Sequence, residues 1–226
     1  FCCCSWSGPP FFEKCKMSGK DTEKILVGLT GGIACGKSVA LNFFRDSGLG
    51  TVSTDLITHR LLSEDEMVNN ALRKEYGDAV FSVEGTVDKR RLGHLIFSNP
   101  SKRRWLEEFL HPLIRTEWLH AVTNCEENLV AVELPLLFEN SLESEFDFVV
   151  SIFSNPKTQM HRLLERGLEQ LEARNRLDAQ LPTALKARRA DFVLLGDGET
   201  SYLGKQVECL CRNFLFPKLA SSSSFK

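Results

Sequence analysis

Residues 31–38 read GGIACGKS and fit the phosphate-loop pattern G-x-x-x-x-G-K followed by Ser or Thr. Gly31 and Gly36 permit backbone angles that a Cβ would forbid, so successive N–H groups can point at phosphate oxygens. Lys37 can reach the β- and γ-phosphates, and the Ser38 hydroxyl can bind Mg²⁺. The pattern therefore predicts ATP and Mg²⁺ as ligands. The residues expected to contact the nucleotide are Gly31, Gly32, Ala34, Cys35, Gly36, Lys37, Ser38 and Val39.

Two carboxylates that follow short apolar runs are candidates for proton and metal chemistry. Asp55 ends the run that begins at Thr51, where it could orient or deprotonate an acceptor hydroxyl, or hold Mg²⁺ through water. The alternative is an N-cap for a helix that starts at Leu56. Glu133 ends the apolar run 129–132, which is the usual place of a metal-binding acid in phosphate-loop enzymes. An ordinary carboxylate at a strand end is the alternative.

Basic residues gather in the last third of the chain. Arg162 and Arg166 lie four residues apart in a predicted helix, and basic residues on helices mostly face solvent. Here they follow the fourth predicted strand, where kinases of small molecules carry a mobile lid. An arginine from such a lid would stabilise the transferring phosphoryl group. We therefore expect Arg162 and Arg166 to be catalytic beside Lys37 and Asp55. The further cations in this region are Arg174, Arg176, Lys186, Arg188 and Arg189.

A His-Pro pair interrupts the long helical stretch before the third predicted strand. Pro112 should start or kink a helix. A histidine at a helix boundary is more often structural than catalytic, so His111 is interpreted only as a contact on the substrate side. Arg115, one turn further on, could bind a substrate phosphate.

The elements that must position these residues alternate between strands and helices. Apolar runs predict strands at 25–30, 51–55, 129–133, 146–153 and 192–195. Segments with helical periodicity predict helices at 38–46, 64–76, 89–97, 102–125, 156–165 and 199–214. This order predicts an α/β protein with the P-loop NTPase fold, in which helices flank a five-stranded parallel sheet.

The spacing of the strands is uneven. About seventy residues separate the second predicted strand from the third, far more than one crossover requires. We expect them to form a helical substrate-binding insertion at about 63–125, beside the sheet edge where open α/β sheets bind ligands. A lid is expected at about 160–190. The globular part then spans 24–215, between a disordered leader at 1–23 and a C-terminal tail at 216–226 that frays at its serines.

Composition narrows the classes of function. The chain has 226 residues, of which 42% are apolar and 26% charged, with a formal net charge of −2. That charge gives no general attraction to nucleic acid or to anionic membrane, and no apolar run has the length of a transmembrane helix. The eight cysteines form no CxxC pair, which favours reduced thiols in the cytoplasm, with the mitochondrion as the alternative. We expect no nucleic-acid or membrane partner, and a monomer or weak homo-oligomer.

Several motifs, taken in order, resemble those of the dephospho-CoA kinase family. The likeness spans about residues 25–213. The phosphate loop identifies only the superfamily, whereas the His-Pro and Pro-Leu-Leu-Phe-Glu motifs are more specific. The segments that carry the resemblance are LTGGIACGKS at 29–38, VSTD at 52–55, GTVDK at 85–89, HPLIR at 111–115, ELPLLFE at 133–139, QMHRLLER at 159–166 and ADFVL at 190–194.

The resemblance implies transfer of the γ-phosphoryl group of ATP to the ribose 3′-hydroxyl of dephospho-CoA, which gives CoA and ADP. It implies that Asp55 faces the acceptor hydroxyl and that Ser38 with Glu133 organises Mg²⁺. The insertion around His111 and Arg115 would bind dephospho-CoA.

The chain departs from the family pattern at several positions. Ser53 stands where the family has the first Asp of a D-A-D turn, and Lys89 replaces an Arg and so lacks its bidentate fork. Ala34 and Cys35 replace Gly and Ser in the loop, and the thiol raises the hypothesis of thiol-sensitive activity. Gly196 stands where the family often has an Asn near the adenine, which leaves the adenine contacts open.

Two other functions remain open from the residues alone. A nucleoside or nucleoside-monophosphate kinase would share the loop, the sheet and the lid. A nucleotide-binding module without catalysis is the alternative from another class, although the chain has Lys37, Ser38 and Asp55, as a catalyst requires.

Overall fold

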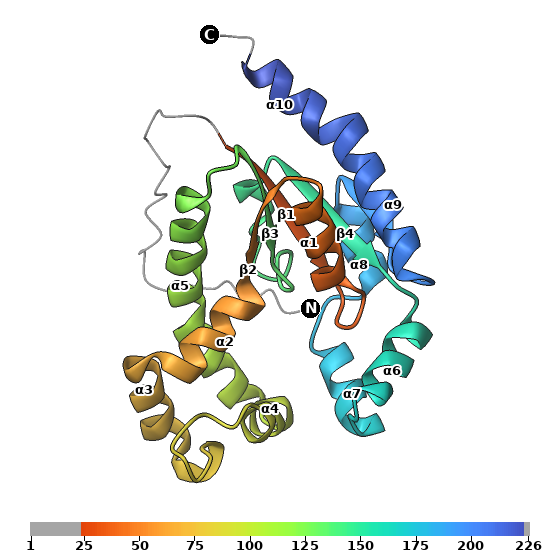
Figure 1. Cartoon of the computed structure of the whole chain (residues 1–226). Coiled ribbons are helices and arrows are strands. Elements are labelled where there is room, and N and C mark those ends of the chain that lie inside the picture. The colour runs from red at the N-terminus through yellow and green to blue at the C-terminus, as the bar shows by residue number, and fades with distance from the viewer. Residues whose placement is uncertain (1–23, 224–226) are drawn as a thin grey trace, which may run out of the picture.

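A computed structural model describes residues 24–223, which form a parallel sheet with helices on both faces (Figure 1). The strand order is β2-β3-β1-β4-β5, and each neighbouring pair is parallel. The predicted five-stranded parallel sheet is confirmed, and the predicted leader lies outside the described residues. The strands are β1 (Ile25–Gly31), β2 (Gly50–Ser53), β3 (Leu129–Glu133), β4 (Phe148–Phe153) and β5 (Phe192–Leu195).

Helices fill the connections between the strands. In chain order they are α1 (Lys37–Asp46), α2 (Thr54–Glu64), α3 (Glu66–Tyr76), α4 (Lys89–Ser98), α5 (Pro100–Asn124), α6 (Pro156–Glu165), α7 (Gln170–Asp178), α8 (Thr183–Arg189), α9 (Thr200–Leu210) and α10 (Phe216–Ser223). Among residues 24–223, no helix combines the length and apolarity needed to span a membrane.

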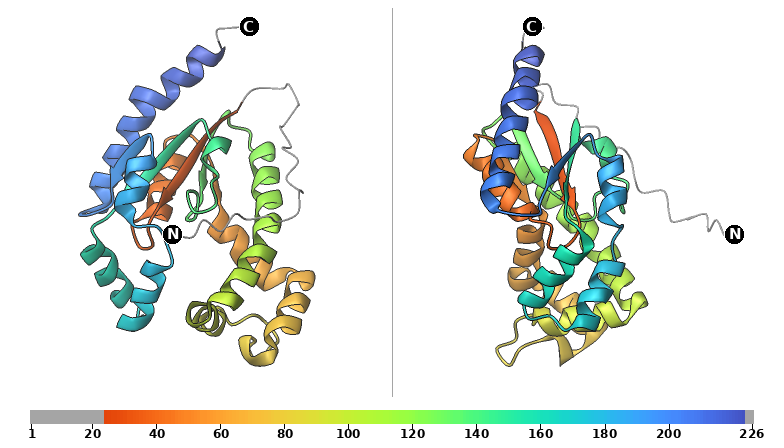
Figure 2. Two further views of the ribbon diagram at one scale, coloured as in Figure 1. Left: turned by 180° about the vertical axis from the view of Figure 1, so that it is seen from behind. Right: turned by 90° about the vertical axis from the view of Figure 1, so that its right-hand side faces the viewer.

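Both faces of the sheet are buried, as the continuous apolar strands require. All five residues of β3, LVAVE, are buried. Helices α1 and α9 cover one face, while α5 and α8 pack against the other (Figures 1 and 2). Because β3 and β1 are parallel, their carboxyl ends lie at the same edge of the sheet. The phosphate loop follows β1 at this edge.

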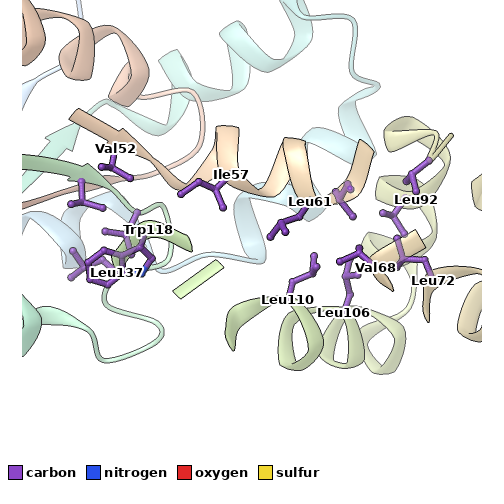
Figure 3. Close-up of a cluster of buried hydrophobic side chains, with 14 of the residues drawn as sticks. Val52, Ile57, Leu61, Val68, Leu72, Leu92, Leu106, Leu110, Trp118 and Leu137 are labelled. Atoms are coloured by element: carbon purple, nitrogen blue, oxygen red, sulfur yellow. The ribbon is translucent and has the colours of Figure 1, made fainter. Parts of the chain in front are cut away.

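Helices α2, α3, α4 and α5 form the predicted insertion, and they share one hydrophobic core with the sheet. Val52 and Trp118 belong to the sheet end of this core, and Leu72, Leu92 and Leu106 to its distal end (Figure 3). Side chains of the two ends are joined without a break through α2 and α5. These helices are therefore packed as one body with the sheet.

Three predicted boundaries need correction. The strand predicted at 51–55 ends at Ser53, because the Ser53 hydroxyl accepts the backbone N–H of Leu56 and so caps a helix that begins at Thr54. The helix predicted at 64–76 is α3, which begins two residues later, at Glu66, because the Asp65 side chain caps it. Pro112 does not start a helix but lies inside α5.

The C-terminal segment is more ordered than a tail. Residues 216–223, predicted as part of the tail, form α10, which continues α9 through a π-turn at Cys211–Leu215. Leu215 is fully buried in the core under α1 and α9, and Leu219 packs against it. Apolar contacts therefore extend the helix beyond the predicted boundary.

Because the insertion and the sheet share one core, they should unfold together. Leu72→Ala, which empties a side chain with 0% exposure, is expected to lower the free energy of unfolding by about 2–5 kcal/mol. The matched control Met67→Ala, on the same helix and 56% exposed, should change it by less than about 1 kcal/mol. Urea unfolding followed by circular dichroism and tryptophan fluorescence measures both. Two separate transitions for Leu72→Ala would contradict the shared core.

Candidate active site

The phosphate loop lies between β1 and α1, as predicted. Gly31 has φ +144, and a Cβ there would meet the Ile152 carbonyl oxygen at 2.5 Å, so this position requires glycine. Gly36 has φ +97 and precedes the first residue of α1. The Lys37 ammonium donates to the Gly32 carbonyl at 2.9 Å and is 8% exposed. The lysine is thus folded against its own loop, within reach of any phosphate that the loop binds.

A buried carboxylate joins the phosphate loop to the residue that caps α2. Glu133 at the end of β3 is 1% exposed. Ser38 donates to one of its carboxylate oxygens at 3.0 Å, and Ser53 donates to the other at 2.8 Å. Burial raises the pKa of the Glu133 carboxyl, the two serine hydroxyls oppose that shift, and the Asp55 charge adds to it. Glu133 is therefore no ordinary strand-end carboxylate.

These oxygen atoms suit Mg²⁺, which prefers hard oxygen ligands and keeps several waters and phosphate oxygens. Ser38 and Glu133 already lie in contact, as two ligands of one ion would. Within the described part of the chain, no three His, Cys, Asp or Glu side chains form a metal site by themselves. The ion would therefore be bound jointly by the protein and the nucleotide phosphates.

Asp55 lies in the first turn of α2 and not at the end of a strand, and its side chain is exposed. The predicted alternative, in which Asp55 caps the helix, is replaced by a cap from Ser53. The Asp55 carboxylate is therefore not occupied in capping. It lines a cavity of about 290 Å³ between α2, α4 and α5.

The lining of that cavity is mostly apolar. Leu106 and Leu110 of α5 contribute to it, and Asp55, His59 and Lys89 are its ionisable members. The complete lining is Asp55, Thr58, His59, Leu62, Lys89, Leu92, Gly93, Ile96, Leu106 and Leu110. Such a pocket can take a flat organic group against its apolar lining and present a hydroxyl to the carboxylate.

The two predicted substrate contacts have other surroundings among the described residues. Neither His111 nor Arg115 lines this cavity. His111 is half-buried, and burial lowers the pKa of its imidazole. Arg115 forms an ion pair with Glu145 at 2.7 Å, so binding a substrate phosphate there would require exchange of this partner.

Arg162 connects the lid to the phosphate loop. Its guanidinium donates to the carbonyls of Ala34 at 3.0 Å and Gly196 at 2.7 Å. Arg166 is exposed at the end of α6. The structure therefore brings one of the two predicted arginines onto the loop and leaves the other at the surface.

Two glutamines also hold the loop, and one of them was missed from the sequence. The Gln159 side chain donates to the Ile33 carbonyl at 2.7 Å. The backbone N–H of Ile33 donates to the side-chain oxygen of Gln180 at 3.0 Å. Gln159 was part of a recognised motif, whereas Gln180 lies in a polar segment without periodicity and gave no signal.

A buried ion pair anchors the base of the lid. Lys186 on α8 is 0% exposed and donates to Glu139 at 2.8 Å and to the Pro135 carbonyl at 2.5 Å. Glu139 also accepts the backbone N–H of Leu181 at 2.9 Å. Burial lowers the pKa of the Lys186 ammonium, while the Glu139 carboxylate opposes that shift. Glu139 thus ties α8 and the residue Leu181 before it to the segment after β3.

Gly196 is a steric requirement of the loop after β5. A Cβ at this position would lie 2.0 Å from the Cys35 carbonyl oxygen. The glycine lets the two loops touch, and its carbonyl accepts the Arg162 guanidinium. An asparagine could not occupy this position in the observed backbone.

The sequence of the chain is similar to those of one family of known proteins. The family model described as dephospho-CoA kinase matches residues 25–201. A dephospho-CoA kinase of Thermosynechococcus vestitus is 38% identical over 184 residues, covering 80% of this chain and 91% of that protein. One from Bacillus cereus is 32% identical and covers 84% of this chain and 97% of its own length.

Two solved structures superpose on most of this chain. The Thermus thermophilus protein TT1252 superposes with a TM-score of 0.71 at 28% identity, covering 85% of this chain and 98% of that one. The dephospho-CoA kinase from Campylobacter jejuni superposes with a TM-score of 0.60 at 26% identity, covering 83% and 95%.

The surroundings of Cys35 determine how reactive its thiol should be. The thiol is 0% exposed, and burial raises its pKa, with the Lys37 charge opposing that shift. We expect iodoacetamide at neutral pH to label Cys35 at least tenfold more slowly than the exposed Cys209. Peptide mass spectrometry after timed labelling measures both in one sample. Labelling of Cys35 as fast as Cys209 would restore the hypothesis of a reactive Cys35.

Proposed function

The chain belongs to the dephospho-CoA kinase family, and we propose that its phosphate loop, Glu133, Asp55 and the lid each have a separate role in the kinase reaction. The enzyme transfers the γ-phosphoryl group of ATP to the ribose 3′-hydroxyl of dephospho-CoA, the last step of CoA biosynthesis. The assignment of individual residues to this reaction is the proposal.

The phosphate loop binds ATP. Backbone N–H groups of residues 31–38 and the start of α1 receive the β- and γ-phosphates. Lys37 exchanges the Gly32 carbonyl, its partner at 2.9 Å, for phosphate oxygens. Its charge then stabilises the transferring group. The wider set of contacts is Gly31, Gly32, Ala34, Cys35, Gly36, Lys37, Ser38 and Val39.

Ser38 and Glu133 would hold Mg²⁺ together with the nucleotide, and the ion would supply neutralisation of the phosphate charge. Ser53 keeps the Glu133 carboxylate oriented from its other side. This support matters because a buried carboxylate without hydrogen bonds would be driven toward its protonated form, which binds metal poorly.

Asp55 serves as the base for the acceptor. The 3′-hydroxyl gives its proton to the Asp55 carboxylate while its oxygen forms a bond to the γ-phosphorus, and the bond from that phosphorus to the ADP oxygen breaks. Arg162 and Arg166 stabilise charge on the transferring group from the lid, and His111 with Arg115 contributes to the dephospho-CoA side.

The observation that carries this proposal is the single hydrogen-bonded path from Ser38 through Glu133 to Ser53, the cap of the helix that bears Asp55. This path links Ser38 to the helix that bears Asp55 through one carboxylate, which supports the proposed metal site and the proposed base. The test is ADP release with ATP, Mg²⁺ and dephospho-CoA, beside nucleoside and nucleoside-monophosphate acceptors. We expect ADP and CoA with dephospho-CoA alone. A better rate with another acceptor would contradict the assignment, and ATP binding without turnover would point to a non-catalytic module.

Replacing the candidate base should separate chemistry from nucleotide binding. Asp55→Asn keeps the shape but removes the proton acceptor, so kcat should fall by about 10²–10⁴-fold, while the Kd for ATP changes less than about threefold. Steady-state kinetics and calorimetric titration of ATP measure the two. Glu64→Gln, an exposed carboxylate at the other end of α2, is the control. An Asp55→Asn enzyme with wild-type kcat would exclude Asp55 as the base.

Lys37→Ala should abolish turnover for a different reason. The variant loses the cation that contacts the β- and γ-phosphates, so we expect both ATP affinity and kcat to fall. The same kinetic and titration measurements, made beside Asp55→Asn, should show ATP binding impaired in Lys37→Ala alone. Unchanged ATP binding would contradict the predicted position of the lysine.

A further inference from the structure

The lid contacts the insertion as well as the phosphate loop, and Arg176 makes that contact. Helix α7 of the lid packs against α4 of the insertion. The Arg176 guanidinium lies 5.0 Å from the centre of the Phe97 ring. A Cβ on Gly93 would be 3.4 Å from the Arg176 Nη2 atom, so the guanidinium lies next to the Gly93 position of α4. The arginine thus reaches across from one side of the cleft to the other.

The hydrogen-bonding capacity of Arg176 is only partly used by the described residues. Its Nη2 atom pairs with Glu172, one turn earlier on the same helix, at 2.6 Å. Its Nε atom is buried and has no hydrogen-bond partner. A buried donor without an acceptor costs about 1–3 kcal/mol. A side chain kept in this state is suited to a ligand that supplies the missing acceptor.

The position of Arg176 indicates which ligand. Gly93, next to which the guanidinium lies, lines the same cavity as Asp55 and Lys89. In dephospho-CoA the diphosphate is attached to the 5′ carbon of the ribose that carries the reacting 3′-hydroxyl. A ribose that presents its 3′-hydroxyl to Asp55 would therefore place the diphosphate toward another part of the cavity lining. Lys89 belongs to that lining, and Arg176 lies beside Gly93, which also belongs to it.

We propose that Arg176 binds the diphosphate of the acceptor, exchanging Glu172 for phosphate oxygens, and so determines that the lid closes on phosphorylated acceptors. The proposal rests on the proposed function, because it takes the cavity beside Asp55 as the acceptor site. A guanidinium suits this ligand because its planar N–H groups bind two phosphate oxygens at once. Glu172 holds the arginine in place until the acceptor arrives.

The contact also explains why the lid would respond to the acceptor. Arg176 bridges α7 and α4, so a phosphate bound by Arg176 from the acceptor cavity adds a charge-assisted link between the lid and the insertion. An acceptor without phosphate adds no such link. Recognition of the diphosphate and closure of the lid therefore both depend on Arg176.

The test compares three variants in the acceptor kinetics. Arg176→Gln should raise the KM for dephospho-CoA about 10- to 100-fold, with the KM for ATP changed less than about twofold. Arg176→Lys keeps the charge without the planar fork and should recover part of the loss. Arg174→Gln is the matched control, because Arg174 is on the same helix, is 70% exposed and pairs with Asp178. It should leave both KM values unchanged.

A second measurement separates phosphate binding from a purely structural contact with Phe97. AMP and adenosine are tested at saturating ATP as inhibitors competitive with dephospho-CoA. The wild-type enzyme should bind AMP at least tenfold more tightly than adenosine, and Arg176→Gln should lose that preference. A preference that survives in Arg176→Gln, or a variant that loses kcat with its KM for dephospho-CoA unchanged, would overturn the proposal. Failure of the wild-type enzyme to use dephospho-CoA would instead overturn the proposed function.

Discussion

The buried carboxylate of Glu133 is the contact on which the rest of the active site depends. Strand β3 lies between β1 and β2, so its terminal side chain is flanked by the phosphate loop after β1 and by the helix after β2. Ser38 comes from one neighbour and Ser53 from the other, and each binds one carboxylate oxygen. The Thr54 hydroxyl also donates to the Glu133 backbone carbonyl at 2.8 Å. The strand order thus fixes the phosphate loop and the start of α2, which bears Asp55, relative to each other.

The Glu133 carboxylate can be buried because each of its oxygen atoms accepts a hydrogen bond. Removing a carboxylate from water raises its pKa, and hydrogen bonds to the charged form oppose the rise. In Glu133 the burial effect is larger than the serine contributions. A magnesium ion would reverse that balance, since a divalent charge favours the ionised form. The two serine hydroxyls are thus the hydrogen-bond donors that oppose the effect of burial on the pKa of Glu133.

The sequence predicted the parts of this site that depend on local pattern. The phosphate loop, the strand before it and the apolar strand that ends at Glu133 have short-range signatures, and all three were predicted. The boundary of β2 was wrong because Ser53 and Thr54 are equally acceptable at a strand end and at a helix start. The choice is made by the distant Glu133, which binds both residues.

Contacts between distant segments could not be predicted for the same reason. Arg115 was read as free to bind phosphate, yet Glu145 lies beside it only because α5 returns along the sheet. Lys186 was one cation among several, and the fold alone pairs it with Glu139, 47 positions away by the difference of the two residue numbers. In each case the residue type indicated a charge to be satisfied, whereas the partner depended on the folded chain.

The lid is attached to its surroundings by contacts of different strength. At its base, Lys186 and Glu139 form a buried pair, and loss of one partner of such a pair costs about 3–5 kcal/mol. At the phosphate loop, Gln159, Gln180 and Arg162 contribute hydrogen bonds worth about 1 kcal/mol each, and somewhat more where the guanidinium is the donor. The base should therefore stay fixed while the outer contacts exchange. Those outer contacts include the backbone N–H of Ile33 in the phosphate loop, which donates to Gln180, so a ligand that took this donor would have to displace the Gln180 side chain.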